Sequence, residues 1–77
     1  MQELVLYYQP TCGYCFKVLN FMKKNDISIP LKNTSDYSIR QELIDIGGKG
    51  QVPCLLIDGK AMYESDDIID YLVTLKK

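Results

Sequence analysis

The chain has 77 residues, of which 47% are hydrophobic and 25% are charged, and its formal net charge is −1. These values are typical of a small soluble protein, so we expect one domain over residues 1–77, and the lack of a basic tract predicts no nucleic-acid partner. The sequence contains no histidine, which excludes acid–base and metal chemistry that depends on that residue.

The apolar pattern predicts alternating strands and helices, beginning with a strand over residues 3–8. This short apolar run ends at the breaker Gln9-Pro10-Thr11, and residues 13–25 follow as a helix with apolar residues at helical spacing. Residues 27–31 alternate like a second strand, in which Pro30 indicates a sheet edge or a bulge.

The second half of the chain predicts two helices around a β-hairpin. In chain order we expect a helix over about 37–46 capped by Ser35-Asp36, a strand over 54–57, the turn Asp58-Gly59, a strand over 60–63 and a helix over about 66–75 capped by Ser65. The order βαβ, then α, then ββα requires one right-handed parallel crossover and adds antiparallel strands. The predicted fold class is therefore α/β, with a four-stranded mixed sheet flanked by three helices.

The apolar runs are short. Leu4–Tyr8 cannot span a membrane or form the core of a signal peptide, and no basic segment precedes it. We therefore expect a cytoplasmic protein that does not contact a membrane. Thiols are kept reduced in the cytosol, and three cysteines do not indicate a disulfide framework.

Two of the cysteines form the motif Cys12-Gly13-Tyr14-Cys15 at the junction between the first strand and the first helix. Unpaired amides and the positive end of the helix dipole favour a thiolate at Cys12, which is the reactive form. Cys15 lies within the first helical turn, close enough to form a disulfide with Cys12. We predict that Cys12 is the nucleophile and Cys15 the resolving thiol. The alternative, a structural zinc site, needs four ligands, and only Cys54 remains.

The element order, the Cys-x-Tyr-Cys motif, Val52-Pro53 before the third strand and Ser65-Asp66-Asp67 at the last helix together resemble a glutaredoxin. Glu64-Ser65 followed by Asp67-Ile68-Ile69 is also similar to the glutathione-binding segment in the N-terminal domain of glutathione transferases, which share this fold. The resemblance covers about residues 3–76 and implies a thioredoxin-like (glutaredoxin) fold.

The resemblance implies a glutathione-dependent thiol–disulfide oxidoreductase, with glutathione as cosubstrate. The Cys12 thiolate would attack the glutathione sulfur of a mixed disulfide and release the protein thiol. A second glutathione, or Cys15, would then regenerate Cys12. The implied partners are glutathione and glutathionylated or disulfide-containing proteins, and the implied state is a monomer.

The resemblance also implies which residues bind glutathione. Tyr14 would line the groove, and the main chain of Val52, before a cis Pro53, would pair with the ligand as a short extra strand. Each has a plainer alternative, because Tyr14 can be a surface aromatic and Pro53 can simply begin a strand.

Charged and helix-end groups complete the implied glutathione site. Ser65 and Asp66 would hold the γ-glutamyl group, through the free amides of the helix and through the Asp66 carboxylate. Lys49 would take the glycine carboxylate, and its alternative is a solvated lysine in a glycine loop. Cys54 is either a small buried strand residue or a thiol near enough to the site to react.

Gly13 stands where proline is commonest in glutaredoxins. Relatives with a small residue there include several that ligate a [2Fe–2S] cluster between two subunits, through the first cysteine of each subunit and two glutathiones. A cluster-binding homodimer with Cys12 as ligand is therefore the alternative function. A redoxin that works without glutathione is a third hypothesis, against which the Ser65-Asp66 site argues.

Overall fold

The computed structural model describes residues 3–75 of the chain. Four strands and three helices follow one another in the order β1 (Leu4–Tyr8), α1 (Gly13–Lys24), β2 (Leu31–Asn33), α2 (Tyr37–Gly47), β3 (Cys54–Ile57), β4 (Lys60–Met62) and α3 (Ser65–Leu75). Each of these helices is too short or too polar to cross a membrane.

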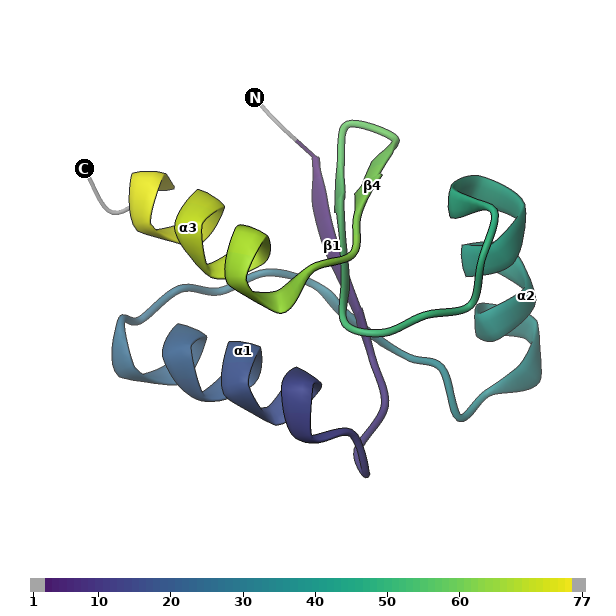
Figure 1. Ribbon diagram of the computed structural model, residues 1–77, viewed down its shortest axis with the longest axis horizontal. Helices are drawn as coiled ribbons and strands as arrows, with labels where there is room; N and C mark the ends of the chain where they lie inside the picture. Colours follow the sequence, from purple (N-terminus) through teal and green to yellow (C-terminus); the bar gives the residue numbers. More distant parts are fainter. Residues whose placement is uncertain (1–2, 76–77) are drawn as a thin grey trace.

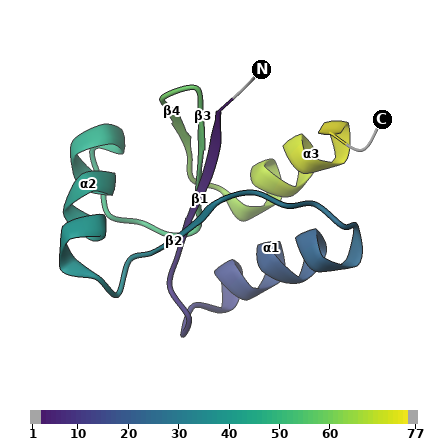
Figure 2. The ribbon, with the colours of Figure 1, turned by 180° about the vertical axis from the view of Figure 1, so that it is seen from behind.

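The four strands form one mixed sheet in the order β2-β1-β3-β4. β1 pairs in parallel with β2, with Leu6 opposite Leu31, and it pairs antiparallel with β3, which in turn pairs antiparallel with β4. Helices α1 and α3 cover one face of the sheet and α2 covers the other, as both views of the ribbon show (Figures 1 and 2). The predicted α/β architecture is confirmed.

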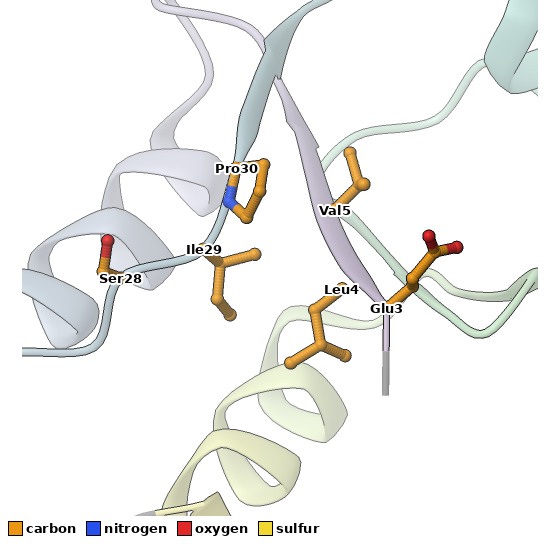
Figure 3. A pocket seen from close by; sticks show the side chains of 6 residues that line it. All are labelled: Glu3, Leu4, Val5, Ser28, Ile29 and Pro30. Atoms are coloured by element: carbon orange, nitrogen blue, oxygen red, sulfur yellow. The ribbon is translucent and has the colours of Figure 1, made fainter. Parts of the chain in front are cut away.

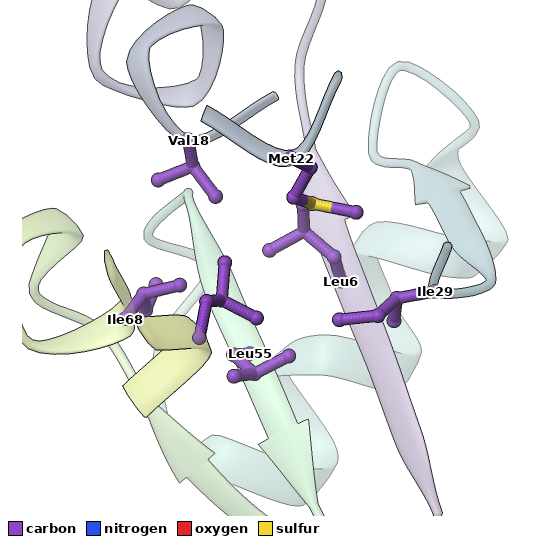
Figure 4. Packing of buried hydrophobic residues seen from close by; sticks show 7 residues of the cluster. Leu6, Val18, Met22, Ile29, Leu55 and Ile68 are labelled. Atoms are coloured by element: carbon purple, nitrogen blue, oxygen red, sulfur yellow. The ribbon is translucent and has the colours of Figure 1, made fainter. Parts of the chain in front are cut away.

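The main core lies between the sheet and the pair α1 and α3 (Figure 4). Side chains alternate along the central strands, so Leu6 and Leu55 face this side. Residues four apart on each helix complete the cluster, whose buried members are Leu6, Val18, Met22, Ile29, Leu55, Ile68 and Leu72. This packing fixes the first turns of both helices relative to the sheet.

A smaller cluster of Tyr7, Leu43 and Cys54 lies under α2, on the opposite face. The buried Tyr7 hydroxyl donates a hydrogen bond of 2.6 Å to Glu42, whose carboxylate also accepts one of 2.8 Å from Lys32. Burial of a hydroxyl without a partner is costly, so this bond lets the tyrosine pack between α2 and the sheet.

The second strand differs from the prediction, because it spans Leu31–Asn33 and not residues 27–31. Pairing begins with a hydrogen bond of 2.9 Å from the Leu6 amide to the Pro30 carbonyl. Proline has no N–H to donate, so the ladder develops only after it. Ile29 is buried, and the alternation that suggested a strand reflects burial in the core. β2 lies at the sheet edge, as Pro30 indicated.

The helix ends show one further difference. Asp36 caps α2 as expected, accepting a hydrogen bond from the Ser38 amide, and the left-handed Gly48 (φ 87°) follows the helix. Ser65, however, is the first residue of α3 and not its cap. The Glu64 carbonyl accepts the Ile68 amide at 2.9 Å, so Glu64 occupies the cap position.

Candidate active site

The Cys12 thiol lies at the start of α1, as its N-cap residue, with extended backbone angles (φ −92°, ψ 121°). Its sulfur accepts a hydrogen bond from the Cys15 amide at 3.3 Å, and its thiol lies 3.8 Å from the Val52 carbonyl oxygen. Of the three cysteines, Cys12 alone is partly exposed, and Cys15 is fully buried. Cys12 is therefore the thiol that a substrate can reach.

The two thiols of the motif have opposite electrostatic environments. Burial raises the pKa of Cys12, but hydrogen bonds from the Cys15 side chain and from the Cys15 and Tyr14 amides outweigh it and hold the pKa below its ordinary value. Burial, and then the hydrogen bond with Cys12, raise the pKa of Cys15 to about 12. The thiolate therefore forms first on Cys12, as the nucleophile prediction requires.

Three segments enclose a cavity of about 390 Å³ beside this thiol, which we call the thiol cavity. β3 begins at the end of the sheet where β1 finishes, and β4 returns to that end, so α1 and α3 both start there. The lining residues come from the first turn of α1, the loop before β3 and the start of α3: Tyr14, Gln51, Val52, Pro53, Tyr63, Glu64, Ser65 and Asp66. Five of the six residues that were expected to bind glutathione are among them.

The Val52–Pro53 peptide bond is cis, as expected. The Val52 carbonyl faces the Cys12 thiol, so the thiol and the main chain before Pro53 lie together at one edge of the cavity. An extended ligand that pairs with this main chain would bring its own sulfur close to Cys12.

Lys49 lies outside the cavity lining, unlike the other five expected residues, but it contacts Tyr63, which is part of that lining. Its ammonium group is 4.8 Å from the centre of the Tyr63 ring, and the Tyr63 hydroxyl donates a hydrogen bond of 2.9 Å to the Lys49 carbonyl. Tyr63 and Gln51 also line the cavity and were not predicted from the sequence. The sequence indicates them only by position, because Tyr63 directly precedes Glu64-Ser65 and Gln51 directly precedes Val52-Pro53.

The Asp66 carboxylate has a partner that the sequence did not reveal. Lys17 on α1 forms an ion pair of 2.7 Å with it, and both side chains are largely exposed. Exposed pairs contribute little stability, because water and salt screen both charges. The pair can therefore open readily, and a ligand ammonium at Asp66 would have to share or displace Lys17.

Cys54 is fully buried and packs with Tyr7 and Leu43 on the α2 side. Burial raises its pKa to about 11. A protonated thiol without access to solvent is unreactive, so the environment favours the buried strand residue over the reactive thiol.

A second cavity, of about 420 Å³, lies near the start of β1, and we call it the β1 cavity. It lies where the segment before β2 runs beside β1, next to the point where pairing begins at the hydrogen bond from Leu6 to Pro30. Ile29 and Pro30 line one side and Leu4 and Val5 the other (Figure 3). Its other two lining residues are Glu3 and Ser28. None of the six is a cysteine.

Comparison with known proteins agrees with this geometry. Residues 6–77 match the family model described as glutathione S-transferase, N-terminal domain, and the chain belongs to that family. The likeness of Glu64-Ser65 to transferases is thereby supported, whereas membership of the glutaredoxins is not shown. No curated protein sequence matches the chain.

Solved structures place the fold in the thioredoxin-like class, as expected. Glutathione transferase Omega 3C from Trametes versicolor is 32% identical with a TM-score of 0.82, over 97% of this chain and 34% of that one. Glutaredoxin C1 from Populus tremula x tremuloides is 21% identical with a TM-score of 0.70, and the match covers 95% of this chain and 76% of that one. A thioredoxin-like protein is 24% identical with a TM-score of 0.77, and the match covers 95% of this chain and 97% of that one. The chain spans about a third of the length of the transferase.

Proposed function

We propose that the protein is a glutathione-dependent thiol–disulfide oxidoreductase with glutaredoxin activity, which reduces glutathione mixed disulfides and protein disulfides. The observation that carries the proposal is the position of the Cys12 thiol. It combines partial exposure and a lowered pKa with a place at the edge of the thiol cavity. Perturbed thiols beside a polar cleft are characteristic of functional sites.

The proposed reaction begins when the Cys12 thiolate attacks the glutathione sulfur of a mixed disulfide. A Cys12–glutathione disulfide forms, the original S–S bond breaks, and the other thiolate leaves and takes a proton from water. A second glutathione thiolate then attacks the glutathione sulfur, which releases glutathione disulfide and restores the Cys12 thiolate. The Cys15 amide stabilises Cys12 as nucleophile and as leaving group.

Cys15 offers a second way to resolve the intermediate, by forming a disulfide with Cys12. Its burial and its pKa of about 12 leave little thiolate at neutral pH. We therefore expect glutathione to resolve most turnovers, and the Cys15 route to serve substrates that lack a glutathionyl group.

The thiol cavity offers carboxylates and helix amides to a zwitterionic ligand, and Lys49 lies beside one of its lining residues. Glu64 and Asp66 supply carboxylates and the first turn of α3 supplies amides, which suit the ammonium and carboxylate of the γ-glutamyl group. Lys49, whose ammonium group lies against the Tyr63 ring, would provide a cation for the glycine carboxylate. In this proposal the six residues Tyr14, Lys49, Val52, Pro53, Ser65 and Asp66 bind glutathione.

The test is glutathione-dependent reduction of a small glutathionylated peptide, with Cys54→Ser as a control variant outside the cavity. We expect turnover that requires glutathione and is unchanged in Cys54→Ser. Turnover without glutathione would favour the glutathione-independent redoxin. Conjugation of glutathione to an electrophile, with no disulfide reduction, would favour a transferase. Either result would overturn the proposal.

The alternative function is a homodimer that shares a [2Fe–2S] cluster. Within residues 3–75 no group of three or more His, Cys, Asp or Glu side chains could hold a metal ion. Cys12, the one accessible thiol, supplies a single ligand per chain, so only a cluster shared with a second chain and with glutathione sulfurs fits these residues. A Cβ at Gly13 would meet nothing within 4 Å, so the turn before Cys15 is sterically open.

Gly13→Pro separates the two functions. Proline is well tolerated in the first helical position and fixes its backbone. If the cluster needs a flexible turn, the variant should lose the visible absorption that follows anaerobic reconstitution with iron, sulfide and glutathione, while disulfide exchange persists. Absence of such absorption in the wild type would reject the cluster alternative.

A further inference from the structure

Tyr63, which follows β4 and precedes the cap of α3, contacts Lys49 in two ways. Its hydroxyl donates to the Lys49 carbonyl at 2.9 Å, and the Lys49 ammonium group lies 4.8 Å from the centre of its ring. The main chain and the side-chain charge of one residue are therefore both held by a tyrosine that lines the thiol cavity.

Gly47, the last residue of α2, fits closely against the same hydroxyl. A Cβ at Gly47 would lie 1.8 Å from the Tyr63 hydroxyl oxygen and 2.8 Å from the ring carbon that bears it. No side chain can therefore occupy position 47 while Tyr63 keeps this place. The left-handed conformation belongs to the next residue, Gly48 (φ 87°), so the tyrosine contact is the feature that requires glycine at position 47.

Lys49 lies in a segment that would otherwise have wide conformational freedom. Gly48 precedes it and Gly50 follows it, and glycine restricts the backbone less than any other residue. A cation at the end of such a segment would spread over many positions, and a ligand carboxylate would have to order it on binding. The two contacts from Tyr63 remove that freedom in advance.

We propose that Tyr63 is a positioning residue that holds the Lys49 ammonium at the rim of the thiol cavity and so sets the affinity for a thiol ligand that carries a carboxylate. The inference rests on the proposed function. Tyr63 connects the two walls of the cavity, because it contacts the loop before β3 and directly precedes the α3 end that holds Glu64 and Ser65.

The first test is Tyr63→Phe, which keeps the ring under the ammonium and removes the hydroxyl. We expect KM for a glutathionylated peptide to rise about threefold to fivefold, the factor for one net hydrogen bond, with kcat and the pH dependence of Cys12 alkylation unchanged. Tyr37→Phe, at an exposed tyrosine on α2, is the matched control and should keep wild-type values.

Gly47→Ala reaches the same contact without changing Tyr63. The new methyl group would overlap the Tyr63 hydroxyl, so the ring must move, and we expect it to lose its bond to Lys49. KM should rise as in Tyr63→Phe. In a Lys49→Met background, by contrast, Tyr63→Phe should leave KM unchanged, because the charge through which Tyr63 acts is gone.

A nuclear magnetic resonance measurement tests the placement without turnover. The Lys49 ε-protons should show a ring-current shift in wild type, a smaller one in Tyr63→Phe, where the hydroxyl no longer holds the Lys49 main chain, and none in Tyr63→Leu. Wild-type KM in both Tyr63→Phe and Gly47→Ala would overturn the inference and leave the proposed function intact. A wild-type protein that does not reduce glutathionylated peptides would overturn both.

Discussion

The two cavities near the sheet are similar in size and opposite in chemistry. The β1 cavity, of about 420 Å³, has mainly aliphatic walls, whereas the thiol cavity, of about 390 Å³, is lined by tyrosines, carboxylates and the first turn of α3. Only the second lies next to an accessible thiol. A candidate binding site is chosen by convergent polar groups beside a perturbed titratable residue, and these criteria, unlike volume, select the thiol cavity.

The difference between the cavities follows from the topology. The ends of β1 and β4 and the starts of α1 and α3 meet at the thiol cavity, where unpaired helix amides and a loop main chain face the same space. At the other end of β1, the segment before β2 forms no ladder with it, because pairing begins only at the Pro30 carbonyl. One cavity thus presents helix amides and polar side chains that can recognise a ligand, whereas the walls of the other are mainly aliphatic.

The largest expected effect is loss of the nucleophile at the thiol cavity. Cys12→Ser should reduce glutathione-dependent disulfide reduction by about a thousandfold or more, because the other two thiols are buried. Cys15→Ser should keep most of the activity on glutathione mixed disulfides, since glutathione resolves the intermediate. Steady-state kinetics on both variants checks this. An active Cys12→Ser with an inactive Cys15→Ser would reverse the assignment.

Alkylation with iodoacetamide compares the thiols directly. The thiolate reacts, so the rate at Cys12 should rise with pH around a midpoint below the ordinary cysteine pKa. Burial raises the pKa of Cys54 to about 11, so Cys54 should stay unmodified at neutral pH while the protein is folded. Mass spectrometry of the labelled peptides gives both results. Labelling of Cys54 at neutral pH in the folded protein would contradict its burial.

Filling the thiol cavity should weaken substrate binding. Ser65→Tyr places a ring beside the α3 amides and should raise KM for a glutathionylated peptide about tenfold or more, with kcat less affected. Ser65→Ala, which adds no bulk, is the matched control and should stay within about threefold of wild type. Equal KM values for Ser65→Tyr and wild type would mean that the ligand binds elsewhere.

The elements of the fold were largely predictable because local patterns determine them. Val18 and Met22 are spaced four residues apart and mark α1, and the turn Asp58-Gly59 marks the hairpin. The exception was β2. The apolar alternation around Ile29 arises because that side chain is buried in the core, not because the segment is a strand. Strand pairing starts only at Pro30, and an apolar pattern does not indicate where backbone hydrogen bonds begin.

The candidate site was predictable only where residues have a local motif. Cys12 and Val52-Pro53 could be found in this way. Lys17 and Asp66 are 49 positions apart and meet only because α1 and α3 pack side by side, so no sequence pattern revealed their ion pair. Tyr63 was missed for the same reason, since its partner Lys49 is 14 positions away.

The Lys17–Asp66 pair predicts a smaller effect at the thiol cavity. Lys17→Met keeps the aliphatic stem and frees the Asp66 carboxylate for a ligand ammonium, so KM should fall about twofold at low ionic strength. Added salt should remove the difference, because it screens exposed charges. Lys23→Met, at the other end of α1, controls for net charge. A rise in KM would instead mean that Lys17 itself helps to hold the ligand.

The smallest effect is expected at the β1 cavity, where a substitution tests whether only the thiol cavity takes part in substrate recognition. Ser28 is exposed and lines that cavity, so Ser28→Tyr adds the same bulk there that Ser65→Tyr adds at the thiol cavity. Surface substitutions away from a functional feature change stability by about 0.5 kcal/mol or less. Both kcat and KM should therefore equal those of wild type, in the same peptide assay. If Ser28→Tyr raises KM as Ser65→Tyr does, the β1 cavity also takes part in substrate recognition, and the proposed difference between the two cavities is wrong.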